Sequence, residues 1–167
     1  MTPPLYIAAL NPESPRMRED AARLHAAFLA NDAAARFGPS WLERFYYRRL
    51  SALPGVTCRL AYLRGVAVGL IVVERNGGRS RRQTLRAYWR DAAVATLRSL
   101  CDSPRRIADL GWNLRALLTP LPRANNIVHL AFAPGCRHLV EGPLLTAALE
   151  DLGARDRTGP RPLRRAA

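Results

Sequence analysis

The hydrophobic and polar positions in the first part of the chain predict one strand followed by two helices. Residues 5–10 are mostly apolar and predict a short strand. Ser14 is a suitable helix N-cap and Pro15 suits the first helical position, and apolar residues then recur every three or four positions. A second helix is expected from Pro39, with the same spacing of large apolar side chains until a Pro-Gly pair ends it.

The middle of the chain changes to a period of two, which predicts a β-hairpin. Apolar residues alternate over 56–62 and again over 66–72, with Arg64 and Gly65 at the bend. Gly69 interrupts the second run. A glycine inside a strand indicates either a bulge or a close approach of another part of the backbone, and both interpretations stay open.

The second half predicts two helices, a strand and a final helix. The two helices span about Arg81 to Cys101 and Pro104 to Leu118. The apolar run Asn126–Phe132 follows as a strand. After it we expect a loop that contains Arg137 and Gly142, and then a helix with its leucines on one face. The predicted class is α/β in the mixed α+β sense: a mainly antiparallel sheet flanked by helices, in the order strand, helix, helix, strand, strand, two helices, strand, helix.

Composition supports one globular domain and excludes several classes. The 167 residues are 49% hydrophobic, which is enough for a core. The sequence contains no run of about 18 apolar residues, so it predicts no membrane span. The first residues do not have the pattern of a signal peptide. The cysteines are Cys58, Cys101 and Cys136; their odd number and irregular spacing argue against disulfides or a zinc site. A cytoplasmic location is the expectation.

The net charge of +13 raises nucleic acid as a partner, but the kind of basic residue weakens that interpretation. All 26 basic residues are arginine. Together with abundant Ala, Pro and Gly, this bias is typical of coding from GC-rich DNA, in which arginine accumulates without selection for binding. Nucleic-acid binding therefore stays an alternative function, and nucleic acid is not the expected partner.

The connection after the last strand carries the most specific pattern. A strand that turns into a helix N-terminus directs backbone N–H groups and the positive end of the helix dipole at one point, which favours an anion. Residues 137–142 fit Arg/Gln-x-x-Gly-x-Gly/Ala at their first and last positions, with Val140 in place of the first glycine. With the lead-in 130–134, this segment resembles the diphosphate-binding loop of the GNAT family of acyl-CoA-dependent N-acetyltransferases.

The resemblance implies a function and a set of site residues. Acetyl-CoA, or another acyl-CoA, would be the co-substrate, and an amine on a small molecule or protein would be the acceptor, with no metal. A backbone N–H near Phe132 would polarise the thioester, and His129 or Glu74 would serve as general base. The residues that the resemblance assigns to the cofactor are Ala131, Phe132, Arg137, His138, Leu139, Val140, Glu141, Gly142 and Pro143.

Structural interpretations of the same residues stay open. Val140 resists the backbone conformations that glycine permits, Glu141 would repel a diphosphate, and Pro143 has no N–H to donate. The connection could therefore hold no ligand. His129 could be a buried histidine with satisfied hydrogen bonds, and Glu74 a surface charge at the end of a strand. His25 lies among alanines with no evident partner.

The resemblance covers residues 5–152 and leaves the last third of a GNAT domain without a counterpart. We expect a GNAT-like domain over 1–153, a helical insertion at 79–119, and a disordered Arg/Pro-rich tail at 154–167. The chain would then be a truncated or frame-shifted copy, or a second subunit would supply the missing strand. The open edge of strand 126–132 would allow a homodimer. A non-catalytic interaction module, or a truncated pseudoenzyme, is the alternative function.

Overall fold

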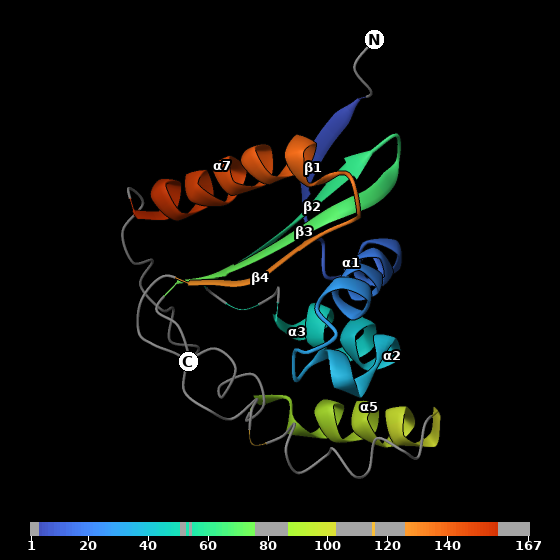
Figure 1. The fold of residues 1–167 in the computed structure, drawn as a ribbon. Helices are drawn as coiled ribbons and strands as arrows, with labels where there is room; N and C mark the ends of the chain where they lie inside the picture. The colour runs from blue at the N-terminus through green and yellow to red at the C-terminus, as the bar shows by residue number, and fades with distance from the viewer. Residues whose placement is uncertain are drawn as a thin grey trace.

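The protein is built on one four-stranded antiparallel sheet. The computed structural model describes residues 4–50, 53, 55–75, 87–102, 115 and 126–156. The strands lie in the order β1-β2-β3-β4 (Figure 1). Their bounds are β1 Leu5–Ala9, β2 Val56–Leu63, β3 Val66–Glu74 and β4 Asn126–Phe132. The predicted mixed α+β class with an antiparallel sheet is confirmed.

The helices begin close to where the sequence predicts them. Helix α1 (Pro15–Phe28) starts at the predicted cap, where Ser14 Oγ accepts a hydrogen bond from the Met17 N–H at 3.4 Å. The helix predicted from Pro39 is present as three consecutive pieces. These are α2 (Pro39–Trp41), a π-helical segment η2 (Leu42–Tyr47) and α3 (Arg48–Leu50), preceded by the short 3₁₀ helix η1 (Ala35–Phe37).

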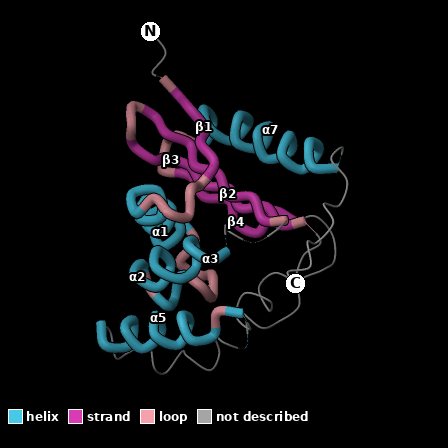
Figure 2. The backbone as a smooth tube through the Cα atoms, turned by 180° about the vertical axis from the view of Figure 1, so that it is seen from behind, coloured by secondary structure: helices cyan, strands magenta, loops and turns pink. Residues whose placement is uncertain are grey.

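The sheet separates two apolar layers. Helices α1, α2 and α3 cover one face, and α7 (Arg137–Asp156) covers the other (Figures 1 and 2). Alternation along β2 and β3 supplies both layers, because successive side chains of a strand point to opposite faces. Leu60, Leu70 and Val72 belong to the layer with α1. Ala61, Ile71 and Val73 belong to the layer with α7.

Two bulges interrupt the register and redirect side chains. Ala61 pairs with Gly69 and Tyr62 with Ala67, so Val68 is an extra residue in β3. Val72 pairs with His129 and Val73 with Ile127, so Val128 is an extra residue in β4. A bulge breaks the alternation of side chains. Val128 consequently packs against the α1 layer, next to the buried His129.

The remaining predicted elements agree in part. Of the helix expected from Arg81, the described part is α5 (Trp89–Asp102), which packs on α2 through a 3.2 Å hydrogen bond from Trp41 Nε1 to Thr96 Oγ1. The helix expected over 104–118 lies outside the described residues, apart from position 115. Residues 154–156, assigned to a disordered tail, are helical because α7 continues through them, which corrects that boundary.

The helices also bear on membrane insertion. No helix in the described ranges combines the length and the apolar character that a membrane crossing needs.

Candidate functional site

The segment predicted as an open loop is the start of helix α7. Only residues 133–136 connect β4 to the helix, and Gly135 makes this turn with a φ of 74°. The N–H groups of Leu139 and Val140 already donate to the Cys136 carbonyl, at 3.1 and 3.2 Å. Amides that are bonded within a helix cannot converge on a diphosphate. The predicted loop over residues 137–142 is therefore wrong.

The helix extends this far because Val140 and Leu144 are buried against the sheet. Both are fully buried, one helical turn apart, and they lie over Gly69 of β3. A Cβ added at Gly69 would lie 2.6 Å from Val140 Cγ1 and 2.8 Å from Leu144 Cδ1. The atoms that approach Gly69 belong to side chains and not to the backbone, and the predicted bulge lies at the neighbouring residue Val68. Val140 occupies the position at which the motif has its first glycine, and its side chain fills the apolar layer between α7 and the sheet.

The other residues of the motif do not face a common point. Arg137 and Glu141 form a two-bond ion pair on the surface, at 2.9 and 3.1 Å. The hydrogen bonds of this pair raise the pKa of the guanidinium and lower the pKa of the carboxyl group. His138, Gly142 and Pro143 are exposed. The assignment of these residues to a cofactor stays a prediction, but the geometry expected to support it is absent from the described segment 126–156.

The two predicted general bases, Glu74 and His129, are both buried, and they lie at different positions along the β3–β4 pair. Glu74 ends β3 opposite Asn126, with 2% of its surface exposed, so the interpretation as a surface charge is wrong. His129 lies opposite Val72 and is 4% exposed. Their catalytic roles stay predictions. The alternative interpretation of His129, a buried histidine that is hydrogen-bonded, agrees with its contacts.

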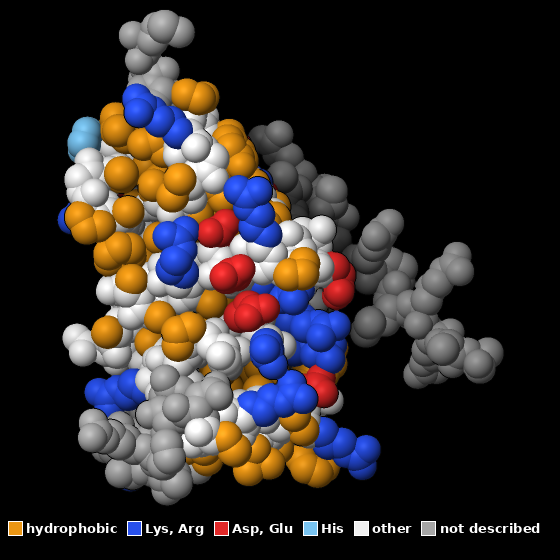
Figure 3. Space-filling view, turned by 90° about the vertical axis from the view of Figure 1, so that its right-hand side faces the viewer, with side chains coloured by type: hydrophobic (Ala, Val, Ile, Leu, Met, Phe, Trp, Pro, Cys, Tyr) orange, Lys and Arg blue, Asp and Glu red, His pale blue; other side chains and the backbone are white. Residues whose placement is uncertain are grey.

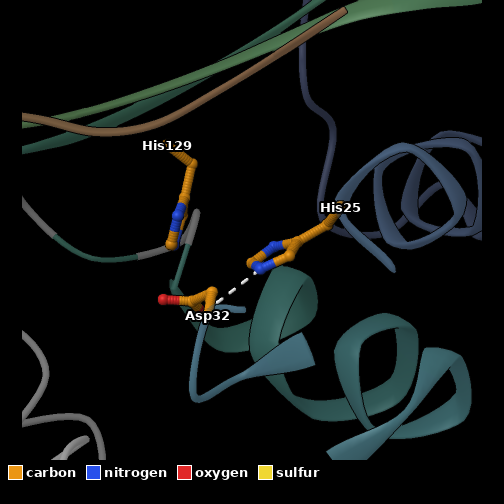
Figure 4. A group of neighbouring side chains, drawn as sticks. All are labelled: His25, Asp32 and His129. Atoms are coloured by element: carbon orange, nitrogen blue, oxygen red, sulfur yellow. Dashed lines mark hydrogen bonds and ion pairs between the residues drawn. The ribbon is translucent and has the colours of Figure 1, made fainter. Parts of the chain in front are cut away.

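His129 belongs to a buried cluster that the sequence analysis did not find. Its Nε2 lies 2.6 Å from the Tyr46 hydroxyl. His25 Nδ1 lies 2.7 Å from the Tyr47 hydroxyl, and His25 Nε2 lies 3.2 Å from Asp32 Oδ2. The two imidazole rings are 4.5 Å apart between centroids. Figure 4 shows His25, Asp32 and His129 turned toward one another from α1, the following loop and β4.

The acceptor chemistry of Asp32 determines the direction of one hydrogen-bond chain. An ionised carboxylate only accepts, so His25 Nε2 donates its hydrogen to Asp32 Oδ2, and His25 Nδ1 lies within hydrogen-bond distance of the Tyr47 hydroxyl. Burial alone would raise the pKa of Asp32. The hydrogen bond from His25 and the charges of His129 and His25 outweigh burial and lower this pKa well below its usual range. Burial raises the pKa of Tyr47, which therefore stays a hydroxyl donor.

The π-helical segment η2 explains how two neighbouring tyrosines reach two histidines. A π-helix has more residues per turn than an α-helix, so consecutive side chains lie closer together around its axis. Phe45, Tyr46 and Tyr47 are all buried. Periodicity of 3.6 residues does not predict three consecutive inward positions. The sequence signal that could have revealed the cluster is the Tyr-Tyr pair in an apolar helix, together with a histidine on the apolar side of α1.

A second polar feature is a groove of about 610 Å³ between α5 and the helices α1 to α3. Arginines dominate its lining: Arg18, Arg44, Arg48, Arg49 and Arg98, together with Asp91. On the face in Figure 3, arginine side chains gather at the level between α1 and α5, with acidic side chains among them. We call this feature the arginine groove.

Comparisons with protein-family models, with curated proteins and with solved structures found no match to this chain.

Proposed function

We propose that this protein binds a phosphate-bearing small molecule in the arginine groove. The observation that carries this proposal is the convergence of five arginines on one groove of about 610 Å³, a size typical of small-molecule sites. Guanidinium groups present planar, paired donors that match the oxygens of a phosphate. The proposed function is non-catalytic binding of a small molecule, which differs from the interaction module expected as the alternative function.

The charges around the groove leave unpaired cationic capacity. Arg49 forms an ion pair with Asp91. Arg48 lies 4.0 Å from Glu13, and an ion pair between exposed side chains contributes little free energy. Arg44 and Arg98 have no ion pair within the described part of the chain. Repulsion between these groups favours an anion in the groove.

Arg18 offers a further donor at the groove. Its side chain is 12% exposed, and its Nη1 donates to the Pro12 carbonyl at 2.7 Å. Its Nε is buried and has no hydrogen-bond partner among the described residues. A buried donor without a partner is unfavourable by about 1–3 kcal/mol. Nη2 of the same guanidinium lies 3.8 Å from Glu43 Oε1, so a ligand that reaches Arg18 would compete with this carboxylate.

The arginine content alone would be weak support, because codon bias can supply arginines anywhere. Their position is the stronger argument. The arginines come from three separate stretches of the chain, which are α1, the continuous segment η2–α3, and α5. Arg49 is also held in place over the Tyr88 ring, at 4.5 Å from its centroid.

An acyl-CoA-dependent N-acyltransferase of GNAT type is the second candidate function. The observation in its favour is the arrangement of the described elements. An antiparallel β1-β2-β3-β4 sheet with α1 on one face leads through a short turn after β4 into α7 on the other. This order is similar to the first part of the family's fold. The helical start of α7 and the Arg137–Glu141 pair count against a diphosphate site there.

Isothermal titration with ADP and with acetyl-CoA separates the two candidates. Both ligands carry phosphates, but only acetyl-CoA carries the thioester. We expect both to bind the parent protein and to lose at least about 10-fold in affinity in the Arg44→Ser/Arg98→Ser variant. The matched control is Arg23→Ser, because Arg23 is an exposed arginine of α1 that does not line the groove.

Each outcome of this titration supports or contradicts one candidate. Binding of acetyl-CoA that is lost in Gly142→Glu, but retained in the double arginine variant, would support the transferase and contradict the arginine groove. Equal loss in Arg23→Ser would indicate non-specific attraction to a cationic protein and would also contradict the groove. No binding of either ligand at millimolar concentration would remove both candidates.

A further inference from the structure

We infer that His25, Asp32 and His129 form a binding site for a divalent transition-metal ion, of the kind that takes Zn²⁺. This inference rests on the buried cluster and is independent of the arginine groove. One ligand atom from each of the three residues lies within 4.8 Å of the other two. Two imidazole nitrogens and a carboxylate oxygen are a donor set that Zn²⁺ and Fe²⁺ take in proteins.

The distances suit a metal with a small adjustment. Ligand atoms at 2.0–2.1 Å from a tetrahedral Zn²⁺ are separated by about 3.3 Å. His25 Nε2 and Asp32 Oδ2 are already 3.2 Å apart. All three ligand atoms lie within 4.8 Å of one another, so the third ligand must move inward by at most about 1.5 Å. Rotation of a side chain about χ1 and χ2 covers such a distance.

The tyrosines provide the outer contacts that metal-binding histidines normally have. A ligating histidine usually bonds a second partner through its other ring nitrogen, which orients the ring. Tyr47 occupies this position at His25 Nδ1, 2.7 Å away, and leaves Nε2 directed at Asp32. Tyr46 holds the His129 ring through Nε2 at 2.6 Å. These two contacts orient both rings before a metal arrives.

Burial and charge favour a cation at this position. His25 is fully buried and His129 is 4% exposed, whereas the Asp32 side chain keeps 23% of its surface. A carboxylate in such surroundings needs a positive partner, and a divalent ion would supply it. The partial exposure of Asp32 gives the ion a route from solvent. Three protein ligands would leave a coordination position for water.

The sequence offers no motif for this site because its ligands are dispersed. Asp32 is 7 residues from His25, and His129 is 83 residues from its hydrogen-bond partner Tyr46. The prediction that the chain holds no metal rested on the absence of local ligand spacing, and this absence does not extend to residues that the fold brings together.

Zn²⁺ titration of the tag-free full chain, after treatment with a chelator, tests the inference. The parent should carry Cys101→Ser and Cys136→Ser, because these two thiols are at least partly accessible and could bind zinc themselves. We expect one equivalent of Zn²⁺ to bind. His129→Gln removes a proposed ligand and should weaken Zn²⁺ binding by at least about 100-fold. Tyr46→Phe removes the outer hydrogen bond of His129 and should weaken Zn²⁺ binding by about 10-fold. Co²⁺ in place of Zn²⁺ should give visible ligand-field absorption.

The chain contains its own matched control. His138 is exposed on α7, away from the cluster, so His138→Ala should bind Zn²⁺ as tightly as the parent. Asp32→Asn keeps an oxygen acceptor at the partly exposed position and serves if His129→Gln fails to fold, as judged by circular dichroism. Absence of binding to the folded parent would overturn the inference, as would equal affinity in His129→Gln, Asp32→Asn and the parent.

Discussion

The two faces of the sheet differ in chemistry, although the same strands supply both. On the α7 face, Val140, Leu144 and Ala148 close over Ile71 and Val73 in an apolar cluster. Arg59 also forms two hydrogen bonds to Asp151, at 2.6 and 2.7 Å, which tie α7 to β2. This face is a closed packing surface.

The α1 face combines an apolar core with buried polar groups. Two histidines, two tyrosines and an aspartate form two hydrogen-bonded groups there, with distances of 2.6 to 3.2 Å, and the arginine groove lies on the outer side of the same helices. The segment with the most motif-like sequence and the buried polar cluster therefore lie on opposite sides of this sheet. Substitutions on the two faces should therefore have different consequences.

The largest effect should come from truncating a side chain in the α7 layer. Leu144 is fully buried, so Leu144→Ala leaves a cavity and should lower the free energy of unfolding by about 2–5 kcal/mol. Leu149, on the same helix, is 65% exposed, and Leu149→Ala should change the free energy of unfolding by less than about 0.5 kcal/mol. Urea unfolding followed by circular dichroism measures both. Equal effects of the two variants would show that α7 does not pack on the sheet through Leu144.

A smaller loss is expected from filling the close approach at Gly69. Gly69→Ala places a Cβ 2.6 Å from Val140 Cγ1 and must push α7 outward. This displacement should lower the free energy of unfolding by about 1–3 kcal/mol. Gly142→Ala is the matched control, since a Cβ there meets nothing within 4 Å and alanine favours a helix. Thermal unfolding compares the two. A Gly69→Ala protein as stable as the parent would contradict the tight contact between β3 and α7.

The smallest effect should come from the polar cluster on the α1 face. Tyr47→Phe keeps the ring but leaves His25 Nδ1 without its hydroxyl partner, which should cost about 1–2 kcal/mol. Tyr6→Phe is the control, because Tyr6 is 52% exposed and keeps its stacking on Tyr62. The midpoints of urea unfolding give the comparison. A Tyr47→Phe midpoint equal to that of Tyr6→Phe would mean that the cluster contributes no stability.

Local patterns were sufficient for most elements of the fold. The hairpin over 56–74 follows from alternation and from a Gly-containing bend, and the start of α1 follows from a Ser cap and a Pro at the first position. These features depend on residues a few positions apart. The error at 137–142 has a physical origin as well: the apparent loop residues include Val140, whose burial under the sheet extends the helix toward its N-terminus.

The amino-acid sequence alone was enough to predict most of the described elements and the antiparallel hairpin, and it shows the excess of arginine over acidic residues. Which side chains contact one another depends on the packing of the whole fold. His25, Asp32, Tyr46, Tyr47 and His129 come together through a π-helical turn, a loop and a β-bulge. Each of these three features departs from the periods of 3.6 and 2 residues by which helices and strands are predicted from a sequence. Contacts between distant segments depend on how whole layers pack, and no local pattern encodes them.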